Sequence, residues 1–356
     1  MPPLTRWFGV TFGDADRNPS AEQAIRDEIV EKVLVMQAKA AAKQNRPLGR
    51  GTHAKGATVG AQFEVLNIAA ADLDRALSAR LARGMFAKPG IYPATVRFAN
   101  SDSAVQSDFK ADVRSLSFSV DLTREGTVPP EAGLNRQDFS MQSARTLPIN
   151  DAPAFLAITK LLTAENPVRE LRSLAWRDKL RIFRTLALLQ VQISKPLKPY
   201  QQLRYWSNVP FRHGPVDVVK HSATPSPGNP ASPLNRNSPN GLKDELIRHL
   251  NEDKVMSSFD FGVQFLDTGK MTYWGKPRDA NFWIENASVA WDETEAPFHT
   301  VGRLTLLPGS QLQPDAADAT YIDVTHNSSP DSTPLGSINR ARWAGEAASK
   351  KARLGH

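Results

Sequence analysis

The sequence contains no cysteine in 356 residues, which excludes disulfides, thiolate metal sites and cysteine nucleophiles. It also lacks a run of about 18 apolar residues, so we expect no transmembrane helix. The segment 1–8 has no apolar core of the signal-peptide kind. The default expectation is therefore a cytoplasmic protein.

Motifs for nucleic-acid binding are missing as well. The formal net charge is +7, which permits anionic partners, but the basic residues are scattered along the whole chain. The sequence shows no zinc finger, no helix-turn-helix and no basic-aromatic RNA motif. We therefore interpret the charge as a solvated basic surface and expect no nucleic-acid partner.

The first half of the chain predicts an antiparallel sheet or barrel with added helices. A helix opens on a capping-box pattern, Ser20 with Gln23, and ends near Pro47. A second helix is expected over residues 71–82, and a third follows Asp151 to residue 162. The expected strands cover residues 58–65, 94–100, 112–120 and 137–142.

The second half begins with an amphipathic basic helix over residues 168–191. Its leucines and arginines indicate an apolar stripe facing the core and a solvated basic face. A role at a membrane surface is the alternative interpretation.

Strands return after a long segment that is rich in Pro, Ser and Asn. We expect residues 200–240 to be irregular, and a short helix to follow over residues 242–250. A terminal helix is expected to open at Thr333–Pro334. The expected strands of this half cover residues 258–265, 281–291, 300–307 and 321–326. The whole reads as an α+β unit: an N-terminal helical arm over residues 1–46, then a single domain over 47–356 that contains the Pro-rich connection.

The segment Arg50-Gly51-Thr52-His53-Ala54-Lys55-Gly56 places a histidine on a short basic stretch directly before a strand. A histidine exchanges protons near neutral pH, and an arginine three residues away can bind an anionic group. The alternative is an ordinary loop in which His53 makes only local hydrogen bonds.

The order of motifs resembles the haem catalase superfamily, in particular its short members without the additional C-terminal flavodoxin-like domain. The resemblance implies an α+β fold: an antiparallel β-barrel with helical additions and a closing C-terminal helix. It runs from about residue 47 to residue 353. Four patches carry it: Arg50-x-x-His53-Ala54-Lys55-Gly56; Val96-Arg97-Phe98; Asp138 to Gln142 followed by Asp151 and Phe155; and residues 321–353 with Asn339-Arg340-x-Arg342.

This resemblance implies a bound haem b and a role for each matching residue. His53 would move protons on a peroxide, and Thr52 would hydrogen-bond its ring or a distal water. Arg50 and Arg97 would pair with the haem propionates, and Phe155 would form an apolar wall.

Two positions depart from the family pattern. The distal asparagine is replaced by Gln142, which keeps the amide but is longer by one methylene; the alternative is a plain polar residue at a strand end. In catalases a tyrosine four residues after an arginine on the last helix ligates the iron. Here Arg342 is followed four residues later by Glu346. Glu346 is either an anionic iron ligand or an ordinary partner of Arg342, and Tyr321 and His326 are the other candidate ligands.

The resemblance implies an enzyme that acts on hydrogen peroxide or on an organic or lipid hydroperoxide, by peroxidase or rearrangement chemistry or weak catalase activity. It also implies a homodimer. The replacement at Glu346 keeps a second hypothesis open: a non-catalytic protein of the same fold that binds haem weakly or not at all.

Overall fold

A computed structural model describes residues 19–45, 47–70, 73–123, 135–313, 316–317 and 320–355. Its centre is an antiparallel nine-stranded sheet in the order β5-β4-β3-β2-β1-β11-β8-β7-β6. An additional pairing of β5 with β7 closes this sheet into a barrel, with β6 attached to the outer side of β7 in the strand order. The strands are β1 (Gly56–Val65), β2 (Gly90–Asn100), β3 (Arg114–Asp121), β4 (Arg136–Gln142), β5 (Tyr205–Trp206), β6 (Phe211–His213), β7 (Asp217–Pro225), β8 (Ser257–Phe265) and β11 (Phe298–Gln311).

The barrel is filled by aromatic side chains. Phe118 and Phe139 stack with ring centroids 4.7 Å apart, and Phe261 meets Phe139 edge to face at 5.0 Å. At Gly302 a Cβ atom would lie only 2.7 Å from Cζ of Phe63, so a glycine is needed where β11 passes that ring. The alternating burial of the strands agrees with the predicted barrel and confirms the predicted fold class.

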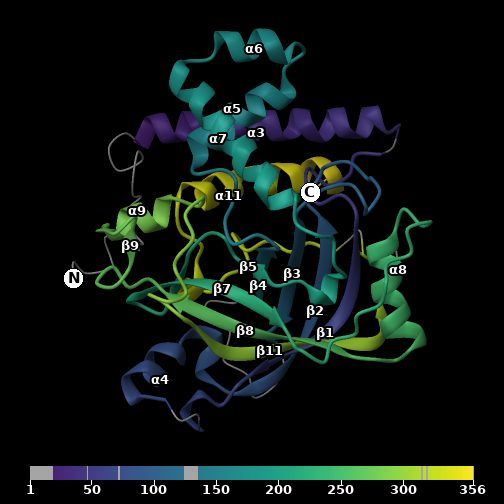
Figure 1. The fold of residues 1–356 in the computed structure, drawn as a ribbon, viewed down its shortest axis with the longest axis vertical. Coiled ribbons are helices and arrows are strands. Elements are labelled where there is room, and N and C mark those ends of the chain that lie inside the picture. The colour runs from purple at the N-terminus through teal and green to yellow at the C-terminus, as the bar shows by residue number, and fades with distance from the viewer. Residues whose placement is uncertain are drawn as a thin grey trace.

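Helices cover one end of the barrel (Figure 1). The long α3 (Pro19–Lys43) packs against α5 (Ala152–Thr163) and against α11 (Ser337–Leu354). Helix α6 (Pro167–Ser173) lies at the end of the molecule farthest from the barrel, and α7 (Trp176–Ile193) runs from there back toward it (Figure 1). Among the helices that the structure describes, none is long and apolar enough to cross a membrane. The remaining elements are short: α4 (Arg75–Leu81), α8 (Gly241–Ile247), α9 (Ala280–Glu285), a β9–β10 hairpin (Thr272–Tyr273, Lys276–Pro277), a π-helix (Arg248–Glu252) and 3₁₀ turns at Ile68–Ala70, Gly84–Ala87, Tyr200–Gln202 and Pro330–Ser332.

Several predicted helix boundaries are wrong. Helix α3, the first described, begins at Pro19, one residue before the predicted cap, and Gln23 donates to Asp27. The helix predicted over residues 71–82 is shorter because Asp74 caps it through the amides of Ala76 and Leu77; residues 71–72 lie outside the described ones.

The predicted irregular connection contains three strands. Within residues 200–240, β5 closes the barrel and β7 runs through its wall, with Val218 and Val219 buried. Because prolines and serines lie at both ends of β7, the composition of this segment predicts irregular structure and not a strand. The longest part of this segment without a named helix or strand runs from 226 to 240.

Two predicted strands near the C-terminus are wrong. Residues 281–291 start with α9, because Asp279 accepts a hydrogen bond from the Phe282 amide and caps a helix. Residues 321–323 are irregular and residues 324–326 form a turn, in which the Asp323 carboxylate accepts hydrogen bonds from the amides of Thr325 and His326.

The terminal helix starts later than predicted. Pro334 forms a β-bridge with Phe211, so the Thr333–Pro334 pair belongs to the sheet edge. The helix begins at Ser337 after Gly336, which has a φ of 88°. A Cβ atom at Gly336 would lie 2.8 Å from the Ile284 carbonyl oxygen, so this turn requires glycine.

Candidate functional site

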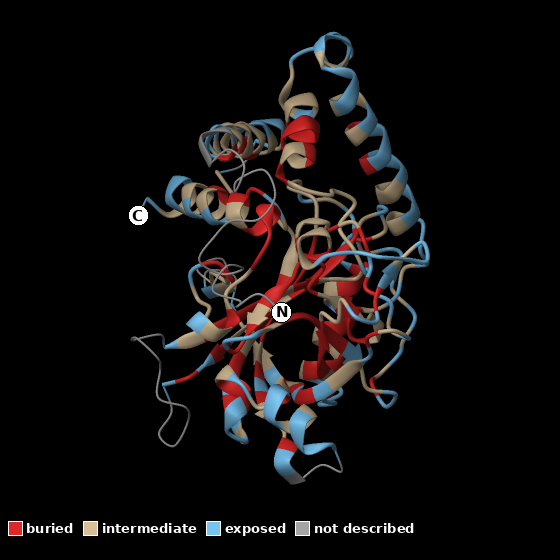
Figure 2. Ribbon diagram, turned by 90° about the vertical axis from the view of Figure 1, so that its left-hand side faces the viewer, coloured by how far each residue is buried: buried red, intermediate tan, exposed pale blue. Residues whose placement is uncertain are grey.

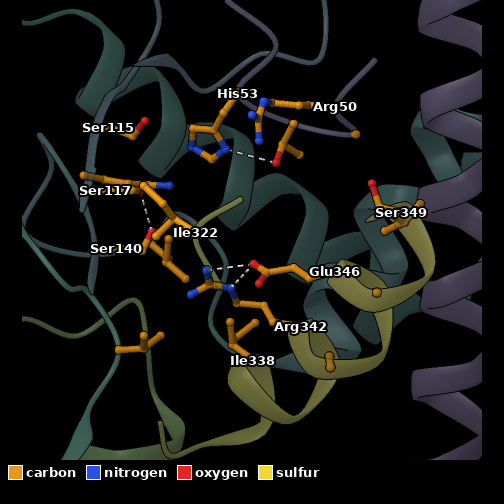
Figure 3. Close-up of a pocket in the computed structure, with 18 of the residues that line it drawn as sticks. Arg50, His53, Ser115, Ser117, Ser140, Ile322, Ile338, Arg342, Glu346 and Ser349 are labelled. Carbon is orange, nitrogen blue, oxygen red and sulfur yellow. Dashed lines mark hydrogen bonds and ion pairs between the residues drawn. The ribbon is translucent and has the colours of Figure 1, made fainter. Parts of the chain in front are cut away.

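A cavity of about 340 Å³ lies between the barrel and the covering helices. Its volume is in the range of pockets for small molecules and cofactors. The walls come from the segment before β1, from β2, β3 and β4, and from α3, α5 and α11. Three consecutive strands and the last helix, which is far from them in sequence, therefore meet around one space (Figure 3).

His53 lies directly before β1 and lines this cavity. Its backbone has a left-handed φ of 57°, which is uncommon for a residue with a side chain. Two hydrogen bonds hold this backbone conformation. The His53 amide donates to the Ser101 carbonyl at 3.2 Å, and the Arg97 guanidinium donates to the His53 carbonyl at 2.8 Å. Thr52 Oγ1 lies 3.0 Å from Nδ1 of the ring, which fixes the orientation of the imidazole.

The His53 imidazole is neutral at physiological pH. Enclosure of the ring, followed by the positive charges of Arg97, Arg342 and Arg50, lowers its pKa to about 3. A neutral imidazole has a free lone pair that can accept a proton. The electrostatics of the cavity therefore keep His53 in the basic form.

The rest of the cavity is rich in positive charge. Arg50 and Arg97 line it from the barrel side, and Lys350 and Arg353 line it from α11. Arg353 is eleven residues after Arg342, a spacing that returns to the same face of a helix. Arg50 is held by the Thr320 carbonyl at 2.5 Å. Such a set of cations suits a ligand with carboxylate groups.

The Arg342–Glu346 pair is the acidic element of the site. Arg342 donates from Nε and Nη2 to Oε1 of Glu346 at 2.9 and 2.8 Å. The other oxygen, Oε2, is buried and receives no hydrogen bond from the described residues. Burial raises the pKa of Glu346; the Arg342 charge opposes this shift, and the nearby Asp323 carboxylate adds to it. Oε2 is therefore a buried acceptor outside the hydrogen bonds that Arg342 donates.

Tyr321 and His326, the other candidate ligands, are tied to Asp323. The Tyr321 hydroxyl donates to Asp323 Oδ2 at 3.0 Å. Burial raises the pKa of this phenol well above its ordinary value, and the carboxylates of Asp323 and Glu346 raise it further. Tyr321 lines the cavity as a neutral phenol. The His326 Nδ1 lies 2.6 Å from Asp323 Oδ2, and its ring is outside the cavity lining.

The opposite wall is polar and formed by the barrel. Ser117 donates to Ser140 at 3.2 Å across β3 and β4, and Ser115 and Gln142 lie beside them in the lining. Phe155 of α5 and Ile338 of α11 supply apolar surface. Figure 3 shows the three serines on the side of the cavity opposite Glu346 and Ser349 in that view.

The eight residues to which the sequence analysis assigned a role in the site line this one cavity, as does the alternative ligand Tyr321, whereas His326 does not. The eight are Arg50, Thr52, His53, Arg97, Gln142, Phe155, Arg342 and Glu346. Their roles remain predictions. The cavity is also lined by residues that were not predicted from the sequence: the serines on β3 and β4, Ile29 and Val33 of α3, and Arg353. Only Arg353 had a readable signal, its helical spacing from Arg342.

Comparison of the sequence with family models and with curated proteins finds no match. The structure is similar to solved catalases over 89% of this chain. A fungal catalase matches with a TM-score of 0.63 and 13% identity, and this chain covers 61% of it. Catalase A from Saccharomyces cerevisiae matches with a TM-score of 0.64 and 16% identity over 63% of its length. A bacterial catalase matches with a TM-score of 0.57 and 13% identity over 60% of its length.

The protein is therefore a closed antiparallel barrel with the catalase fold. The fold part of the predicted resemblance is confirmed. This chain spans less than two thirds of the length of these catalases.

Proposed function

We propose that this protein binds haem b in the cavity between His53 and Glu346 and acts on hydroperoxides. The observation that carries the proposal is the juxtaposition of a neutral histidine and an arginine-held carboxylate on two sides of one cavity in a catalase fold. Hydrogen peroxide and organic or lipid hydroperoxides are the proposed substrates.

The residues present fit a haem. Glu346 Oε2 is buried without a hydrogen-bond donor among the described residues, so a metal cation would satisfy it. A carboxylate is a hard anionic ligand of the kind that suits ferric iron. Arg342 would limit the charge that Glu346 gives to the metal by holding Oε1. Arg50 and Arg97, with Arg353, would bind the two propionates.

When bound, the haem iron supplies the redox chemistry that breaks an O–O bond. The protein supplies the proton transfer. His53 is neutral, so it can take a proton from one peroxide oxygen and return it to the other. Thr52 keeps the ring in place through Nδ1, which leaves Nε2 for the substrate.

The other cavity residues orient the substrate and exclude water. Gln142 offers an amide that can donate to a peroxide oxygen. Phe155 and Ile338 give the cavity apolar surface that an alkyl hydroperoxide can contact.

A second candidate is a non-catalytic protein that keeps the fold without firm haem binding. One observation favours it: Arg342 already neutralises Glu346 within the protein, as an ordinary ion pair at this helical spacing would do.

The absorption spectrum of purified protein with and without added haemin tests the proposal. We expect a Soret band in the wild type, its loss or a strong shift in Glu346→Ala, and no change in Glu252→Ala, an exposed carboxylate elsewhere. A band that is unchanged in Glu346→Ala would contradict the ligand role. Absence of a band in all three proteins would favour the second candidate.

A further inference from the structure

The helices α6 and α7 carry an apolar surface that no described residue covers. Nearly half of the large hydrophobic side chains that are exposed in the described part of the chain lie between residues 162 and 191. They are Leu162 at the end of α5, Val168 of α6, and Trp176, Leu180, Phe183, Leu186 and Val191 of α7. We call this set the apolar face of α6–α7.

The predicted apolar stripe of the basic helix therefore lies largely on its exposed side, while Arg177 and Arg184 are exposed as predicted. In α7 only Ile182 and Thr185 are buried, and Ile182 packs against Ala157 and Ile158 of α5. Trp176, Leu180 and Phe183 recur at helical spacing on the opposite side. Figure 2 shows this outer side of the helix pair as exposed, with the buried positions turned inward. The predicted core-facing leucine stripe is wrong for most of α7.

Positive charges flank the apolar face. Residues 162–198 contain eight Lys and Arg against three Asp and Glu, a formal charge of +5. Arg177 and Arg184 lie on one edge of the exposed side of α7, and Lys179 on the other. Arg177 also lies over the Trp176 ring, at 5.7 Å from its centre.

We propose that the apolar face of α6–α7 docks on the surface of an anionic lipid bilayer. Helices that lie in the membrane interface combine an apolar face with Lys and Arg at its borders, and tryptophan prefers that interface. Contact with a second copy of the same face would bring two charges of +5 together, whereas anionic lipid headgroups attract them. The pair projects from the end of the molecule (Figure 1), so a flat surface can reach it.

Docking would place the membrane one helix layer from the cavity. Helix α5 contacts α7 through Ala157 and Ile158, and it presents Phe155 to the cavity. The inference does not require haem, and its test uses neither haem nor turnover.

Cosedimentation of the full-length protein with vesicles tests the proposal. We expect binding to mixed phosphatidylcholine and phosphatidylserine vesicles, much weaker binding to phosphatidylcholine alone, and loss at high salt. The double variant Trp176→Ser, Phe183→Ser should bind at least about tenfold more weakly. Arg177→Glu with Arg184→Glu should lose the preference for phosphatidylserine.

Matched control variants distinguish binding through this surface from nonspecific binding to vesicles. Trp274→Ser removes an exposed tryptophan from the β9–β10 hairpin, and Lys276→Glu with Lys351→Glu reverses two exposed charges on other elements; these variants should bind as the wild type does. Circular dichroism should show that all variants are folded. Equal binding to neutral vesicles, or unchanged binding by the Trp176 and Phe183 variant, would overturn the proposal. So would a wild-type dimer that this variant dissociates, combined with no vesicle binding.

Discussion

The guanidinium of Arg342 donates from two nitrogens to the same oxygen of Glu346, at 2.9 and 2.8 Å. The second carboxylate oxygen is left buried and without a hydrogen bond from the described residues. This asymmetry is what distinguishes the pair from a surface ion pair, in which water would reach both oxygens.

The Glu346→Tyr variant should hold haem more firmly than the wild type. Arg342 is positioned to stabilise a phenolate at this place, and the resemblance to catalases implies tyrosine there. The rate of haem transfer to an excess of a competing haem acceptor measures the effect. Glu346→Phe is the matched control, because it has the ring without the oxygen; equal transfer rates for the two variants would contradict the prediction.

His53→Gln should reduce hydroperoxide turnover by about 10²- to 10⁴-fold and leave the Soret band in place. The wild-type rate should be insensitive to His53 ionisation from pH 8 down to about pH 5, because its pKa of about 3 keeps the ring neutral there. A fall in the wild-type rate near pH 6.5 that is absent in His53→Gln would contradict this prediction, because it would show that the pKa of His53 is not lowered.

Tyr321→Phe should keep the haem spectrum of the wild type. The phenol is held in its protonated form by burial and by the carboxylates of Asp323 and Glu346, so it is a poor iron ligand. The spectrum of this variant is compared with that of Glu346→Ala under the same conditions. If Tyr321→Phe lost the Soret band and Glu346→Ala kept it, Tyr321 and not Glu346 would be the iron ligand.

Lys220→Met should remove a pH dependence of stability. Lys220 is buried and donates to the Val289 carbonyl at 3.2 Å. Burial, followed by the charge of Arg145, lowers its pKa to about 7 from an ordinary 10.5. Between these values the unfolded chain binds more protons than the folded one, so the free energy of unfolding from this group rises with pH by up to about 1.4 kcal/mol per pH unit.

Denaturant unfolding of wild type and Lys220→Met at pH 7, 8 and 9 measures that slope. The free energy of unfolding of the wild type, minus that of Lys220→Met, should increase as pH rises. Lys276→Met, at an exposed lysine, should keep the wild-type slope. A parallel pH dependence of all three proteins would mean that Lys220 does not titrate in this window.

The sequence by itself determined most strands of the barrel and several of the residues that line the cavity. Strands such as 58–65 alternate because one of their faces fills the barrel with Phe63 and its neighbours, and that pattern is local. The segment around His53 and the spacing of Arg342 and Glu346 are also local, since a helix fixes what lies one turn away.

Only the tertiary structure decided which of these residues meet and what state they are in. His53 and Glu346 are far apart in the sequence. They line one cavity because α11 packs over the barrel. The low pKa of His53 comes from burial of its ring and then from the charges of three arginines on separate elements. The exposed side of α7 was likewise decided by packing: the helix is apolar on one face and has Ile182 on the other, and contact with α5 selected Ile182 for burial.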